Sequence, residues 1–83
     1  MNLVLSRAVL VHLEAQLQSA RRLLDLVLQQ GRAIRARDVE AVLTTLSAIQ
    51  AEVDRRTHLE AVRTDLLARA GEALGVPAQN VTL

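Results

Sequence analysis

Apolar and small residues recur at alternating intervals of three and four between Leu3 and Ile34 of this 83-residue chain. The stripe consists of Leu3, Leu10, Leu13, Leu17, Ala20, Leu24, Val27, Gly31 and Ile34, with Ser6 as its polar exception. This spacing keeps one side of an α-helix directed at a packing partner. It predicts a helix over about residues 2–36 whose stripe packs against another helix. Further apolar residues beside the stripe, such as Val9 and Leu23, widen the apolar surface and favour more than one neighbour.

A second helix is predicted over about residues 38–74. Asp38 is a suitable N-cap, since its carboxylate can accept hydrogen bonds from the free amides of the first turn. The apolar positions that follow have the same spacing and are Val39, Val42, Leu46, Ile49 and Val53. Beyond them the apolar residues resume at Leu59, Val62, Leu66 and Ala70, so the stripe rotates around the helix. Gly75 and Pro77 predict the end of this helix.

The predicted fold is all-α: an antiparallel, coiled-coil-like hairpin of two helices in a single helical domain, residues 1–83. Signals for strands are missing, and the link around 36–38 is so short that the helices must run antiparallel. Residues whose numbers sum to about 74 or 75 should then face each other, for example Leu24 and Ile49, or Leu13 and Val62. Gly31 is expected to let the two helices approach closely near the turn.

The hairpin is expected to need further packing, because a core without aromatic residues is thin at this size. Asn80 and Thr82, in the tail 75–83, are interpreted as two possible N-caps for the first turn of a third helix. The hairpin is therefore interpreted either as the start of a three-helix bundle or as half of a dimeric four-helix bundle.

Charge and composition bear on location and partners. The formal net charge is +1, so there is no basic field to attract nucleic acid. The apolar N-terminus lacks the basic start of a signal peptide, and no apolar stretch approaches the ~18–20 residues that span a bilayer. With no cysteine in the chain, these features favour a cytoplasmic protein with no membrane insertion.

Candidate chemical groups are sparse, and the expectation is a non-enzymatic protein without metal or cofactor. His12 and His58 are expected at the surface or at its boundary, since the Glu-x-x-His pattern of di-metal bundles is missing. No nucleophile triad or phosphate-binding loop occurs. Arg32, Arg35 and Arg37 are interpreted as cations at the negative end of the first helix. The ion pairs Glu52–Arg56 and Asp65–Arg69 are expected on the solvated side.

Two stretches resemble the FlgN family of flagellar export chaperones. The first comprises Leu23-Leu24-Asp25-Leu26 and then 30–42 (Gln-Gly-Arg-Ala-Ile-Arg-Ala-Arg-Asp-Val-Glu-Ala-Val), where one helix turns into the next. The second runs from Arg55-Arg56 through 59–67 to Ala73-Leu74-Gly75-Val76-Pro77. The chain departs from the family at Ile49-Gln50, where members commonly carry Glu-Lys. Members also continue through a third helical region that has no counterpart up to Leu83.

The resemblance implies a cytoplasmic chaperone of flagellar type III export that works without nucleotide or cofactor. Such a chaperone binds hook–filament junction proteins, prevents their premature assembly and brings them to the export gate. A client helix, or the absent third helix, is expected to pack at the end of the hairpin remote from the turn, through Leu3, Leu10, Leu13, Leu17, Leu59, Val62 and Leu66. The alternatives are a structural hairpin that homodimerises into a four-helix bundle with no client, and a regulatory coiled-coil fragment of a larger protein.

Overall fold

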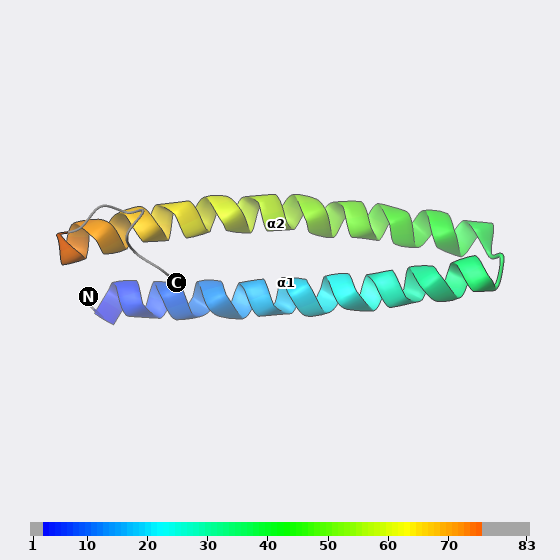
Figure 1. Ribbon diagram of the computed structural model, residues 1–83, viewed down its shortest axis with the longest axis horizontal. Helices are drawn as coiled ribbons and strands as arrows, with labels where there is room; N and C mark the ends of the chain where they lie inside the picture. The colour runs from blue at the N-terminus through cyan, green and yellow to red at the C-terminus, as the bar shows by residue number, and fades with distance from the viewer. Residues whose placement is uncertain (1–2, 76–83) are drawn as a thin grey trace.

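Two long helices lie antiparallel and side by side in the computed structural model, which describes residues 3–75 (Figure 1). Helix α1 spans Leu3–Arg35 and helix α2 spans Val39–Leu74. The turn is at one end of the hairpin, and the start of α1 and the end of α2 lie at the other (Figure 1), here called the open end. The predicted all-α antiparallel hairpin is confirmed. The expected caps Asn80 and Thr82, together with Pro77, lie outside the described residues.

The turn is built by hydrogen bonds at the ends of both helices. The amides of Arg37 and Asp38 donate to the carbonyls of Ile34 (3.1 Å) and Ala33 (3.0 Å), the pattern of a Schellman cap. Arg37 adopts the left-handed conformation that this cap requires, with φ of 55°. Asp38 then caps α2 as predicted, since its Oδ1 accepts from the amide of Ala41 at 3.1 Å.

Helix α2 ends where the sequence predicts. Gly75 adopts a left-handed conformation with φ of 70°, and its amide donates to the carbonyl of Glu72 at 3.3 Å. Glycine suits this position because it has no Cβ to clash with the following carbonyl oxygen.

The predicted register of the two helices is confirmed. The hydroxyl of Thr45 on α2 lies within hydrogen-bonding distance of Gln30 Oε1 on α1. At the open end, Leu5 packs in one cluster with Leu66 and Ala70. The facing pairs Gln30–Thr45 and Leu5–Ala70 have numbers that sum to 75, as the short link demands.

The predicted rotation of α1 about its own axis is wrong. The buried positions of α1 repeat every seven residues and are Leu5, His12, Ser19, Leu26 and Ala33. The predicted stripe is instead exposed, from Leu13 at 42% to Leu3 at 74%. A short link fixes the direction and register of two helices, but it does not dictate which stripe faces the partner. The face toward α2 therefore does not carry the most apolar stripe of α1.

The interface between the helices is consequently polar in its middle. His12 and Glu52, expected on the surface, are only 3% and 8% exposed. Both ring nitrogens of His12 and the hydroxyl of Ser19 lack hydrogen-bond partners among the described residues. Glu52 pairs with Arg55 at 3.5 Å rather than with Arg56, whereas the expected Asp65–Arg69 pair forms at 3.4 Å.

Gly31 does not mark a close approach of the helices, contrary to expectation. A Cβ built at this position would meet the guanidinium of Arg35, on the same helix, at 3.3 Å, and its three nearest neighbours all belong to that guanidinium rather than to α2. Because α1 is rotated, Gly31 lies with the exposed stripe.

Candidate functional site

The two broad faces of the hairpin can be assigned from the buried positions. In an antiparallel pair, residues that directly follow a buried position lie on one face in both helices, and residues that directly precede it lie on the other. The first face carries Leu13, Val27 and Ile34 from α1 with Leu46 and Val53 from α2. The hairpin therefore has an apolar face that its own fold leaves uncovered.

This apolar face is named the outer stripe. It combines the predicted stripe of α1 with the first half of the predicted stripe of α2. Its residues are Leu10, Leu13, Leu17, Ala20, Leu24, Val27, Ile34, Val39, Leu46 and Val53, all exposed. Leu10, Leu17 and Leu24 precede buried positions by two residues, so they lie at the outer edge of this face, about 60° farther around α1 than Leu13 and Val27. The half-buried Val42 and Ile49 lie between the two helices beside it.

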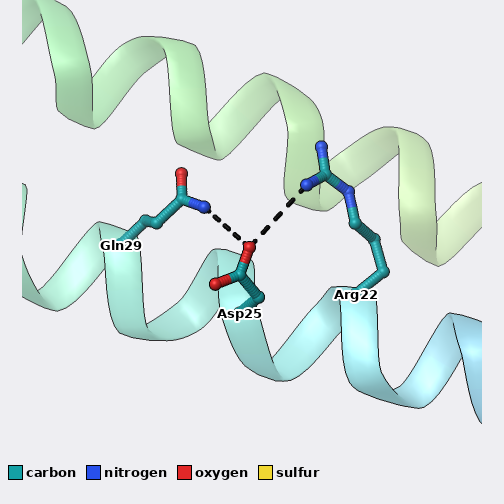
Figure 2. A network of polar contacts seen from close by, with 3 residues as sticks. All are labelled: Arg22, Asp25 and Gln29. Carbon is teal, nitrogen blue, oxygen red and sulfur yellow. Dashed lines mark hydrogen bonds and ion pairs between the residues drawn. The ribbon is translucent and has the colours of Figure 1, made fainter.

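The opposite face is polar near the turn. Asp25 Oδ2 accepts a hydrogen bond from Gln29 at 2.8 Å and forms an ion pair with Arg22 at 3.8 Å (Figure 2). All three residues come from α1, and Asp25 directly precedes the buried Leu26. Such exposed polar networks keep a helix face hydrated and contribute little to stability. This half of the face is a solvated surface.

Toward the open end the same face becomes apolar and hollow. A groove of about 620 Å³ lies between the start of α1 and the second half of α2. It is named the open-end groove and is lined by Leu3, Val4, Arg7, Ala8, Val11, His12, Ala15, Leu59, Val62, Leu66 and Arg69. Its volume is within the ~300–1,000 Å³ typical of ligand sites. Aliphatic side chains make up most of its wall.

The polar groups of the open-end groove are basic or neutral. Arg7 and Arg69 are the charged residues among its described lining, and none of the described residues that line it is acidic. Arg69 is paired with Asp65, but that pair is exposed to solvent. His12 lines the groove as well, buried and without hydrogen-bond partners for its ring nitrogens. The groove therefore suits an apolar ligand that also presents an acidic group.

The structure divides the residues predicted to bind a partner. Leu3, Leu59, Val62 and Leu66 come together in the open-end groove, although Leu66 is itself only 2% exposed. Leu10 and Leu13 belong to the outer stripe and do not line the groove. Leu17 also belongs to the outer stripe and lines, with Leu59, a smaller hollow of about 420 Å³ on that face.

Sequence reasoning missed the α1 wall of the open-end groove. Val4, Ala8, Val11 and Ala15 form this wall. Their intervals of four, three and four are a helical stripe in their own right, but it is short and made of small residues. The leucine stripe of the same helix is longer and gives the stronger pattern, so the short stripe is not recognised from the sequence.

Two findings bear on other kinds of site. Among residues 3–75, no three histidine, aspartate or glutamate side chains are placed to hold a metal ion together. Neither α1 nor α2 has a stretch that is long and apolar enough to cross a bilayer.

Comparisons with protein-family models, with curated proteins and with solved structures found no match to this chain.

Proposed function

We propose that this chain is a helix-binding chaperone, which holds an amphipathic helix of a client protein in the open-end groove. The observation that carries the proposal is the groove itself, because it is apolar, open and formed by both helices. The function needs binding alone, without catalysis or a cofactor.

The shape of the open-end groove favours a helix as its ligand. Along α1 the groove extends from Leu3 to Ala15, which is about 18 Å or three helical turns. An amphipathic helix of that length presents apolar residues at intervals of three and four to such a groove. Acidic residues at the edge of its apolar side would lie near Arg7 and Arg69.

The resemblance to flagellar export chaperones supports a specific class of client. The proposed clients are hook-associated proteins, whose C-terminal helices would be held until export. On this proposal the protein acts in the cytoplasm and passes its client to the type III export gate.

Binding of labelled peptides tests the proposal. Peptides with the C-terminal helices of hook-associated proteins are titrated with the full chain, and fluorescence anisotropy gives the Kd. We expect Val11→Asp to raise the Kd at least tenfold, because it places a carboxylate in the apolar groove at a cost of more than about 1.4 kcal/mol. The matched control is Leu28→Asp, since Leu28 is similarly exposed (51% against 59%) but lies outside both apolar surfaces.

The control should bind with unchanged affinity. A peptide of the same composition, whose apolar residues are spread around the helix, should not bind. If the wild-type chain fails to bind the client peptides while remaining helical, the proposed client class is wrong. Equal weakening by Val11→Asp and Leu28→Asp would exclude the groove as the site.

A further inference from the structure

The outer stripe is a second apolar surface, separate from the open-end groove. About midway along its length, Leu24 and Leu46 are 60% and 53% exposed, and Val39 at its end is 70% exposed. None of its positions between Leu10 and Ile34 on α1, or between Val39 and Val53 on α2, carries a charge. Exposure of each of these apolar side chains to water is unfavourable, so covering the surface would lower the free energy.

The size of the outer stripe is close to that of a standard interface. At a rise of 1.5 Å per residue, the stripe runs for about 36 Å on α1, from Leu10 to Ile34, and for about 21 Å on α2, from Val39 to Val53. Since each helix has a diameter of ~10 Å, its area is on the order of 600 Å². This is at the upper end of the ~300–600 Å² of the largest apolar patch on a typical monomer, and it approaches the ~800 Å² that a standard interface buries on each partner.

The stripe is also complementary to itself. Both halves have spacing of three and four, the period at which helices interdigitate along their whole length. A two-fold axis normal to the face would set the stripe of one hairpin on the stripe of another, so that each contact occurs twice. The stripe itself carries no charge, and the charged residues that lie beside Leu17 and Ala20 are of both signs, Arg56 and Glu60, so the surface does not select a partner of one charge. The core between α1 and α2 is small, since few of the described apolar side chains are buried in it. Packing against a second copy would therefore add stability that a single hairpin lacks.

We infer that a second copy of this chain covers the outer stripe, so that two hairpins pack face to face as a four-helix bundle. In this dimer the buried polar residues remain between the helices of each hairpin. The open-end groove lies on the opposite face of each hairpin and stays accessible. Dimerisation therefore does not depend on the proposed client binding, and either can fail without the other.

Sedimentation equilibrium of the full chain tests this inference. Over about 1–200 µM we expect a mass of about 18 kDa, twice the 9.1 kDa of one chain. Leu46→Ala should raise the dimer Kd at least tenfold, because Leu46 directly follows the buried Thr45 and so lies on the face itself, where the change removes apolar contacts twice across the two-fold axis. Alanine is the strongest helix former, so this variant keeps its helices. Leu28→Ala is the matched control, since Leu28 shares its heptad position with Arg7, Glu14, Arg21 and Arg35.

The control should leave the Kd within about twofold of the wild type, and circular dichroism at 222 nm should report equal helicity for all three chains. A helical wild-type chain of 9.1 kDa at the highest concentration would overturn the inference. So would a dimer that Leu46→Ala and Leu28→Ala weaken equally. Peptide binding by the monomeric Leu46→Ala variant would separate the two surfaces, because Leu46 does not line the groove and the groove should still bind its client.

Discussion

Ser19 is the most completely buried polar side chain of the hairpin, and its hydroxyl has no hydrogen-bond partner among the described residues. With His12 and Glu52, it places polar atoms where a helix pair usually buries leucine. A buried polar group without a partner costs about 1–3 kcal/mol. These residues therefore weaken the packing of α1 on α2, and the hairpin gains less stability from its own interface than its apolar content would allow.

Ser19→Ala should raise the free energy of unfolding by about 1–2 kcal/mol. The change removes the unpartnered hydroxyl and also gains up to about 0.5 kcal/mol of helix propensity. The control is Ser47→Ala in α2, because Ser47 is exposed and gains propensity alone. Urea denaturation at one fixed protein concentration measures both variants, since stability depends on concentration if the chain dimerises. Equal gains from the two variants would mean that burial of the Ser19 hydroxyl costs nothing.

At the scale of the helices, the features that sequence predicts well are local ones. Asp38 and Gly75 form caps through contacts within a few residues, so their roles can be read from the chain. Direction and register also follow, because a short link leaves no other choice. The rotation of α1 depends on contacts with α2 along its whole length, and periodicity alone does not say whether a stripe faces the same chain or another. The sequence predicts that the residues of the outer stripe pack against the other helix of the hairpin, whereas the structure leaves them exposed.

The turn offers a prediction at this scale. Arg37→Gly should stabilise the protein by about 0.5–1 kcal/mol, because Arg37 has a φ of 55° and a non-glycine residue in this region costs roughly 1–2 kcal/mol. The greater chain entropy of glycine when unfolded offsets part of the gain. Arg37→Ala is the control, since it removes the guanidinium but keeps the Cβ. Thermal unfolding should give the Arg37→Gly variant a higher Tm than both the wild type and Arg37→Ala. A similar gain from Arg37→Ala would assign the effect to charge instead.

At the scale of the whole molecule, the outer stripe and the open-end groove occupy opposite faces and differ in charge. The stripe was visible in the sequence as a long leucine pattern, whereas the groove appears only once α1 and α2 are set side by side, because each helix supplies one wall. Leu59, Val62 and Leu66 were expected in a binding site, but their neighbours Val4 and Val11 were not. Salt is therefore expected to affect the two surfaces differently. The outer stripe is uncharged, whereas Arg7 and Arg69 lie at the edge of the open-end groove.

Raising NaCl from 50 to 500 mM should weaken peptide binding about three- to tenfold and leave the dimer Kd unchanged or lower. Exposed ion pairs contribute about 0.2–1 kcal/mol each and are screened by salt, so the contacts of Arg7 and Arg69 with an acidic client should be lost. The burial of apolar side chains in the dimer is not screened by salt. Anisotropy titrations and sedimentation equilibrium in the same buffers measure the two constants. The control is Arg7→Gln, in which peptide binding should start weaker and respond less to salt. A dimer that dissociates at 500 mM NaCl would contradict an interface made by the uncharged stripe, because only charged contacts weaken in that way.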